Sequence, residues 1–208
     1  MTRDTFLRAG SAVIDLLEHP AVTNGWNEQS ALARMSVGAL AGHLARSILQ
    51  VEQYLEAPVP DVSPIDAPAY YLRIDEPADL DSARNTAVRQ RAEQASAQGP
   101  EATADTARRS LDRLRAILPV EPADRLVEAF GSVLTLDDYL KTRLVEIAVH
   151  HDDLRSSLEV DLPDLGEEAI AVAIDVMVET ALRRHGGRAV LTALTRRERD
   201  AAHALRVL

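Results

Sequence analysis

Apolar residues recur every three or four positions along most of this sequence, which is the spacing of α-helices that bury one face. The stretch from residue 36 to 56 shows the pattern well. Ser36 is placed to cap a helix there, and the apolar stripe that follows consists of Val37, Leu40, Leu44, Ile48, Val51 and Leu55. Comparable patterns predict further helices over residues 3–18, 78–118, 135–154 and 166–185. No strand-like alternation or nucleotide-binding glycine loop is evident, so we predict an all-α helical bundle.

Three segments interrupt the helical pattern. Residues 57–77 contain five prolines, too many for the interior of a helix, and are predicted to form a long ordered loop. A Gly-Pro pair at residues 99–100 predicts a break in the helix that contains it. The apolar run at residues 124–134 is too short for a helix and favours extended chain. Thr135 and Asp138 then have the spacing of a capping box that starts the next helix.

Composition argues against several kinds of partner. The chain has 208 residues, with 23 Lys and Arg against 33 Asp and Glu, and its net charge of -10 argues against binding to nucleic acid or to an anionic membrane. It has no cysteine, so any thiol used in its chemistry must be supplied by another molecule. The first twenty residues carry early charges and helical hydrophobicity, so we expect neither a signal peptide nor a membrane span, and we expect a cytoplasmic protein.

The segment TRLVEIAVHHDDL, residues 142–154, places acids and histidines in an otherwise apolar helix. Glu146 and His150 are four residues apart, so they lie on one helix face at a spacing that lets two side chains share an ion. A catalytic zinc site needs a third protein ligand, and His43, at the margin of the apolar stripe over residues 36–56, is the candidate. Two imidazoles and one carboxylate suit Zn(II) or another divalent first-row metal. Alternatively, His43 is a core histidine bonded to a backbone carbonyl, and Glu146 pairs with an arginine.

Two separate runs resemble the signatures of one family. WNEQSALARMSVGALAGHLARS, which starts at Trp26, is similar to the Trp, Ser and Leu-x-x-His-Leu signature of the mycothiol-dependent maleylpyruvate isomerase N-terminal domains, part of the DinB-like superfamily. LTLDDYLKTRLVEIAVHHDDL, which ends at Leu154, resembles the second signature, Thr-Arg-x-x-Glu-x-x-x-His-x-x-Asp-Leu. The resemblance covers most of the chain through about Leu158.

This resemblance implies a DinB-like four-helix bundle over residues 1–160, with a short helical C-terminal extension over residues 161–208 packed on it. It implies a divalent metal, usually zinc, held by His43, Glu146 and His150. It also implies that a low-molecular-weight thiol, mycothiol, is deprotonated at the metal and attacks an electrophilic substrate. A homodimer is a further expectation from the family.

Two neighbours of the expected ligands are candidate catalytic residues. Arg143, one turn before Glu146, is expected to bind a carboxylate of the substrate or of the thiol cofactor; alternatively it forms a surface ion pair. Asp153 is expected to orient His150 or a bound water; alternatively it is only a partner for the helix end. His151 points about 100° away from His150 around the helix, so we exclude it as a ligand.

Other polar and aromatic residues have plainer interpretations. His19, His185 and His203 lie outside any ligand spacing. Trp26 is expected to anchor packing at the end of the bundle rather than to contact substrate. The acidic and arginine-rich face of the helix over residues 78–118 is interpreted as ordinary solvated surface.

Three functions stay open at this point. The leading hypothesis is a metal-dependent enzyme that uses an activated thiol for transfer or isomerisation. The second is a non-catalytic bundle that keeps a structural metal, or has lost it, and serves as a binding or stress-associated module. The third is hydrolysis by water activated at the metal, which ranks last because no convincing general base is near the ligands.

Overall fold

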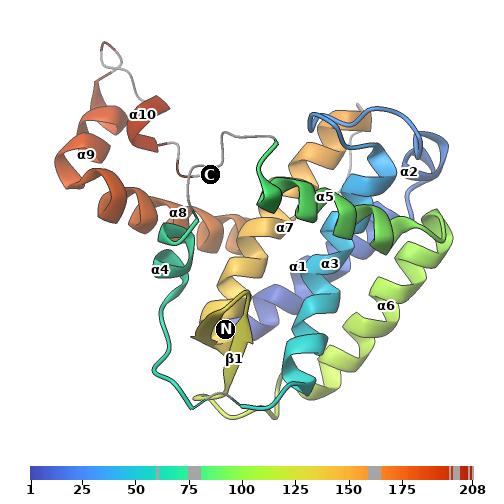
Figure 1. Cartoon of the computed structure of the whole chain (residues 1–208), viewed down its shortest axis with the longest axis horizontal. Coiled ribbons are helices and arrows are strands. Elements are labelled where there is room, and N and C mark those ends of the chain that lie inside the picture. The colour runs from blue at the N-terminus through green and yellow to red at the C-terminus, as the bar shows by residue number, and fades with distance from the viewer. Residues whose placement is uncertain are drawn as a thin grey trace.

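The computed structural model describes residues 1–59, 61–74, 81–158, 165–196, 198, 202–205 and 207. Its helices are α1 (Thr2–Leu17), α2 (Pro20–Asn24), α3 (Val37–Glu56), α4 (Ala67–Leu72), α5 (Ala83–Ser96), α6 (Pro100–Ile117), α7 (Leu136–Leu158), α8 (Glu167–His185), α9 (Gly187–Thr195) and α10 (Ala202–Leu205). Two short strands, β1 (Leu126–Ala129) and β2 (Ser132–Thr135), pair as an antiparallel hairpin. The protein is therefore mostly helical, as its periodicity predicts (Figure 1).

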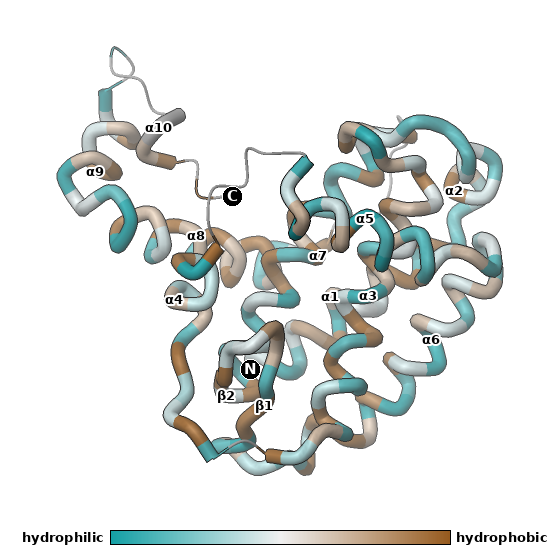
Figure 2. Tube along the Cα trace, in the orientation of Figure 1, coloured by the Kyte–Doolittle hydropathy of each residue, from teal (hydrophilic) through white to brown (hydrophobic). Residues whose placement is uncertain are grey.

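The main core lies between the longer helices. α1 packs against α6 and α7, and α3 packs against the same two helices. Hydrophobic and hydrophilic residues alternate along these helices, so each turns one face inward (Figure 2). With aromatic residues at only 3% of the chain, the core is mainly aliphatic. Its fully buried side chains include Phe6, Leu40, Leu44, Leu111, Leu114, Leu140 and Leu144.

The predicted helix starts are confirmed by their capping hydrogen bonds. The Ser36 hydroxyl accepts a 3.1 Å hydrogen bond from the Ala39 backbone N–H at the start of α3. At the start of α7 the Asp138 N–H donates to the Thr135 hydroxyl at 3.1 Å, and that hydroxyl donates to the Asp138 carboxylate at 3.0 Å. These bonds satisfy backbone donors that have no partner within the helix. They fix where the two helices that carry the histidine and glutamate motifs begin.

Close backbone contact brings α5 against α3 beside the histidine motif. At Gly42 an added Cβ would lie 2.4 Å from the Ala92 carbonyl oxygen and 2.9 Å from the Ser96 Cβ. Only glycine permits this approach, so α5 lies directly over the part of α3 that carries His43. The predicted break between residues 99 and 100 is also confirmed, because α5 and α6 are separate helices and Gly99 has a φ of 89°.

The proline-rich segment over residues 57–77 was predicted to be a loop throughout, and this is wrong for α4. The Asp66 side chain caps α4 by accepting a 2.9 Å hydrogen bond from the Ala69 N–H, and Pro68 lies in the first turn. Proline is tolerated there because the first N–H groups of a helix need no intrahelical partner. Residues 60 and 75–77 lie outside the described residues.

The apolar run at residues 124–134 does contain extended chain, and it forms most of the hairpin. The Ile65 N–H donates a 2.8 Å hydrogen bond to the Val133 carbonyl, which attaches the segment before α4 to β2. This small sheet is the one departure from an all-α architecture among the described residues. It places the turn residue Phe130 near α3, where its ring lies 6.1 Å from the ring of Tyr54.

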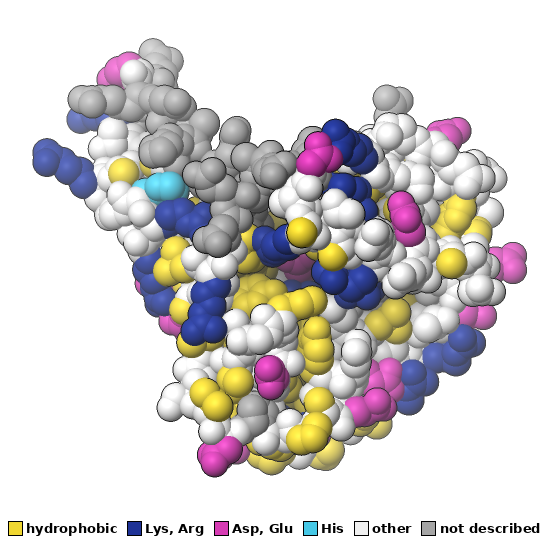
Figure 3. All heavy atoms as spheres, in the orientation of Figure 1, with side chains coloured by type: hydrophobic (Ala, Val, Ile, Leu, Met, Phe, Trp, Pro, Cys, Tyr) yellow, Lys and Arg dark blue, Asp and Glu magenta, His cyan; other side chains and the backbone are white. Residues whose placement is uncertain are grey.

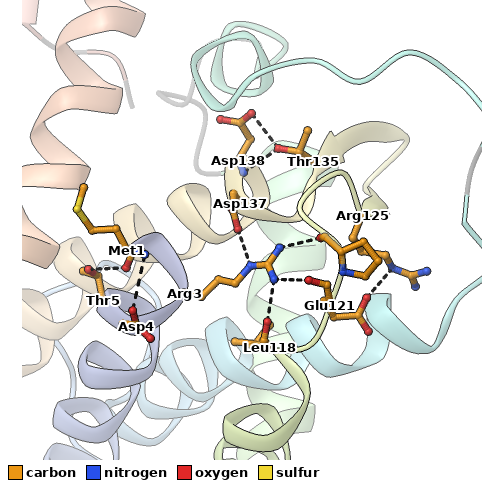
Figure 4. A network of polar contacts seen from close by, with 11 residues as sticks. Met1, Arg3, Asp4, Thr5, Leu118, Glu121, Arg125, Thr135, Asp137 and Asp138 are labelled. Carbon is orange, nitrogen blue, oxygen red and sulfur yellow. Dashed lines mark hydrogen bonds and ion pairs between the residues drawn. The ribbon is translucent and has the colours of Figure 1, made fainter.

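Arg3 joins the beginning of α1 to the chain that links α6 and α7 (Figure 4). Its Nε donates to the Asp137 carboxylate at 2.8 Å, and its other nitrogens donate to three backbone carbonyls, those of Leu118, Glu121 and Pro122, at 2.6–2.9 Å. The Arg3 side chain is only 16% exposed. One residue therefore holds three segments that are far apart in the sequence.

The C-terminal helices lie beside α7 and α4. α8 packs against both, and Arg184 of α8 donates to the Tyr71 carbonyl at 3.0 Å. α9 packs on α8, and α10 contacts both of them. The domain boundary expected after residue 160 falls within residues 159–164, outside the described part of the chain. Across the described helices we find no segment with the length and hydrophobicity needed to span a bilayer.

Candidate metal centre

Packing of α3 against α7 brings the three expected ligands together. His43 Nε2 lies 3.5 Å from Glu146 Oε2, and His150 Nε2 lies 3.6 Å from the same oxygen. The two imidazole rings meet edge to face with their centroids 4.5 Å apart. One ligand atom from each of the three residues lies within 4.8 Å of the others. Each side chain is 16–22% exposed, so the cluster is shielded yet accessible.

These separations fit a metal site better than a hydrogen-bonded cluster. Two atoms that each bond zinc at about 2.0–2.1 Å at a tetrahedral angle lie about 3.3–3.4 Å apart. The Glu146–histidine distances of 3.5 and 3.6 Å are close to that edge and long for hydrogen bonds. Two imidazoles and one carboxylate are also a common catalytic zinc set.

Neither alternative interpretation of these residues matches the contacts in the described part of the chain. His43 Nδ1 is buried and has no hydrogen-bond partner there, so His43 is not held by a backbone carbonyl. Glu146 forms its ion pairs with the two histidines and none with an arginine among the described residues. Both residues are instead turned toward each other.

The electrostatics of the cluster keep Glu146 charged. Burial raises the pKa of Glu146, but the contacts with His150 and His43 outweigh burial and hold its pKa well below the usual range. Burial also lowers the pKa of His43, against the opposing contact with Glu146, so His43 is neutral at pH 7. Burial likewise lowers the pKa of His150, but the hydrogen bond to Asp153 and the contact with Glu146 raise it to about 9.

Asp153 holds His150 from the side opposite Glu146. Its Oδ2 lies 2.9 Å from His150 Nδ1, and its side chain is 25% exposed. A carboxylate on one ring nitrogen fixes the tautomer and directs the other nitrogen, here Nε2, toward the shared site. Asp153 therefore contacts His150, the residue that it was expected to orient.

Residues 6–155 match the model of the mycothiol maleylpyruvate isomerase N-terminal domain. The chain belongs to this family. The matched range includes His43, Glu146, His150 and Asp153, and it ends before α8. Comparison with curated proteins and with solved structures gives no match.

Membership of the mycothiol maleylpyruvate isomerase N-terminal domain family agrees with the two signature runs in the sequence and suggests a mycothiol-related function. Arg143 lies one turn before Glu146 and is buried. Its side chain is 4% exposed, donates to Gln50 and Thr142 at 3.2 Å each, and lies over the Tyr139 ring at 5.0 Å. The alternative in which Arg143 forms a surface ion pair is therefore wrong.

The remaining histidines and Trp26 stand apart from the cluster. His151 is buried, 3% exposed, and is not a member of the potential ligand group. His19 caps α2 by accepting a hydrogen bond from the Ala21 N–H. Trp26 covers Gly38, where an added Cβ would lie 2.6 Å from the indole ring, which supports its interpretation as a packing anchor. The side chain of His203 lies outside the described residues.

A cavity of about 630 Å³ opens beside His43 and Glu146. Several arginines line it, including Arg46 of α3 and Arg91 of α5. Neither arginine was predicted to lie beside the site, and the face that includes Arg91 was interpreted as solvated surface. The sequence could have indicated Arg46, because it follows His43 by three residues and so lies on the same face of α3 as this candidate ligand. For α5 no sequence signal was available, because its position depends on contact with Gly42.

Proposed function

We propose that this protein is a metal-dependent enzyme in which His43, Glu146 and His150 bind one divalent ion. The ion is zinc, and the enzyme uses a low-molecular-weight thiol, mycothiol, against an electrophilic small molecule in a thiol transfer or an isomerisation. The architecture that carries the site is a DinB-like four-helix bundle formed by α1, α3, α6 and α7, and the C-terminal helices are an extension of it.

One observation carries this proposal. Three ligand atoms from two helices lie within 4.8 Å of one another, in a chain that matches the mycothiol maleylpyruvate isomerase N-terminal domain over residues 6–155. The absence of cysteine supports it as well, since the nucleophilic sulfur must then arrive on a cosubstrate. The cavity next to His43 and Glu146 provides room for that cosubstrate and for an electrophile.

The residues around the site have distinct roles in this proposal. A divalent ion lowers the pKa of a coordinated thiol, so that a thiolate is available at neutral pH. Asp153 keeps His150 oriented through the 2.9 Å hydrogen bond to Nδ1. Arg143 supplies a fixed positive charge at the cavity wall, because Gln50 and the Tyr139 ring hold it in place. It binds an acidic group of the substrate and positions it toward the ligands.

Cobalt substitution tests the proposal. The purified protein is loaded with Co(II) and titrated with mycothiol while the absorption spectrum is recorded. We expect stoichiometric cobalt binding and a new thiolate-to-cobalt charge-transfer band that saturates with mycothiol. Protein that binds neither cobalt nor zinc would exclude the metal-dependent enzyme. Metal binding without a charge-transfer band would exclude the thiol chemistry and leave a structural metal or water activation.

Two variants make the test specific. His43→Ala removes one expected ligand and should abolish both stoichiometric metal binding and the charge-transfer band. His19→Asn removes a histidine that is not part of the potential ligand group and keeps a residue that caps α2 well, so it should behave as the unchanged protein. Equal cobalt binding by the two variants would contradict the assignment of His43.

A further inference from the structure

Among the described residues, those that line the cavity beside the candidate metal centre are strongly basic, although the chain as a whole has a net charge of -10. Glu146 is the only carboxylate among its described lining residues, whereas five arginines line it: Arg46, Arg73, Arg84, Arg91 and Arg143. Figure 3 shows basic side chains around the hollow in the middle of the drawn face. A cluster of arginines around one cavity of an otherwise acidic protein indicates that an anionic ligand binds in that cavity.

Three of these arginines come from three packed helices and lie close enough to repel one another. Burial lowers the pKa of Arg46, and the positive charges of Arg91 and Arg143 lower it further. In the described contacts, none of the three forms an ion pair with a carboxylate. Like charges in a partly buried cavity destabilise the fold unless a counter-charge binds there.

Neutral partners hold two of these arginines, Arg143 and Arg91, in position. Arg143 bonds to the Gln50 amide oxygen and lies over the Tyr139 ring. Arg91 lies over the Phe130 ring, 5.7 Å from its centroid. Such contacts fix a guanidinium group without neutralising it, so its charge and several N–H donors stay available to a ligand.

We propose that this cavity binds a phosphoryl group, so that the electrophilic substrate is a phosphate ester. A phosphate monoester carries close to two negative charges and three acceptor oxygens on one compact group, which matches guanidinium groups that converge from α3, α5 and α7. A single carboxylate would balance only one of the five charges. Naming the anion as part of the substrate rests on the proposed function, but the binding of phosphate is measurable without metal or thiol.

Isothermal titration calorimetry tests the proposal directly. The full chain, freed of metal by a chelator that is then dialysed away, is titrated at pH 7.5 and constant ionic strength with inorganic phosphate and, separately, with succinate. We expect phosphate to bind at one site per chain and about tenfold more tightly than succinate. Arg46→Gln and Arg91→Gln should each weaken phosphate binding by about tenfold or more.

Arg109→Gln is the matched control, because it makes the same change of charge on α6, where the Arg109 side chain is 62% exposed and pairs with Asp105. It should leave phosphate binding unchanged within about twofold. Thermal unfolding of each variant shows whether it is folded. If Arg46→Gln is unfolded, Arg91→Gln, on the more accessible α5, provides the test of phosphate binding. Absence of phosphate binding, tighter binding of succinate, or equal loss in Arg109→Gln would overturn the proposal.

The two proposals fail in different ways. If the cobalt protein shows no thiolate band but phosphate binds and depends on Arg46 and Arg91, the thiol chemistry is wrong and the phosphoryl site stands as a binding site. If the band appears and phosphate does not bind, the thiol chemistry stands and the substrate is not a phosphate ester.

Discussion

Asp153 Oδ2 lies 2.9 Å from His150 Nδ1, within one turn of α7, while His150 Nε2 faces Glu146. The helix itself creates this arrangement, because residues three and four positions apart share a face. The imidazole is therefore held between two carboxylates from its own helix before α3 contributes anything. The part of the candidate site on α7 is preorganised, and His43 of α3 is the third candidate ligand.

Removal of the Asp153 carboxylate should weaken metal binding. We expect Asp153→Ala to lower zinc affinity by about 10- to 100-fold, because His150 loses the partner that fixes its tautomer and orientation. Competition with a chromophoric chelator measures this affinity. Asp152→Ala, an exposed neighbour on the same helix, is the control and should bind zinc normally. Equal zinc affinity in the two variants would show that Asp153 does not support the site.

Close contact between α3 and α5 makes Gly42 sensitive to any side chain. Gly42→Ala should lower the free energy of unfolding by about 1–3 kcal/mol, because its Cβ would lie 2.4 Å from the Ala92 carbonyl oxygen and force α5 outward. Urea denaturation measures the change. Gly187→Ala is the control, since its Cβ would meet nothing nearer than a Leu182 methyl at 3.8 Å. A neutral Gly42→Ala would mean that α5 does not pack on α3 this closely.

Loss of Arg3 should destabilise the protein although it lies far from the site. Arg3→Ala leaves three backbone carbonyls and the Asp137 carboxylate without their donor, and we expect a loss of about 2–4 kcal/mol in the free energy of unfolding. Arg109→Ala removes an exposed i,i+4 ion pair and should change it by less than about 0.5 kcal/mol. Similar losses in both variants, measured by chemical denaturation, would contradict a special role for Arg3.

The contact between Glu52 of α3 and Arg113 of α6 should make stability depend on pH. The hydrogen bond from Arg113 lowers the pKa of Glu52, and the 2.7 Å hydrogen bond from Ser110 lowers it further against the effect of burial. The folded protein therefore binds this proton less readily than the unfolded chain does. The stabilisation is complete above the unfolded pKa of about 4.3 and is lost as pH falls through the lower folded pKa.

Glu52→Gln tests this dependence. The difference in free energy of unfolding between the unchanged protein and Glu52→Gln should be largest near pH 7 and should shrink below about pH 4. Denaturation curves at a series of pH values measure it. Glu93→Gln, an exposed glutamate on α5, is the control for loss of one charge and should have little effect at any pH. A difference in the free energy of unfolding that grows toward low pH would contradict the lowered pKa of Glu52.

Much of this protein is determined locally and was therefore predictable. Helix periodicity, the caps at Ser36 and Thr135, and the i,i+4 spacing of Glu146 and His150 depend only on residues near one another in sequence. The helix α4 was missed because prolines in a first turn are compatible with a helix, and counting them does not reveal their position. The hairpin was only partly foreseen, because its strands are four residues each.

The sequence by itself determined where α3 and α7 begin, which faces they bury, and that two candidate ligands stand one turn apart on α7. Only the tertiary structure decided that His43 Nε2 comes within 3.5 Å of Glu146, that Arg143 is buried, and that arginines from separate helices share one cavity. The physical reason is that periodicity fixes a direction around one helix axis. The distance between two helices depends instead on the packing of all the side chains between them. At Gly42 it depends on the lack of a side chain, which lets α5 lie close to α3.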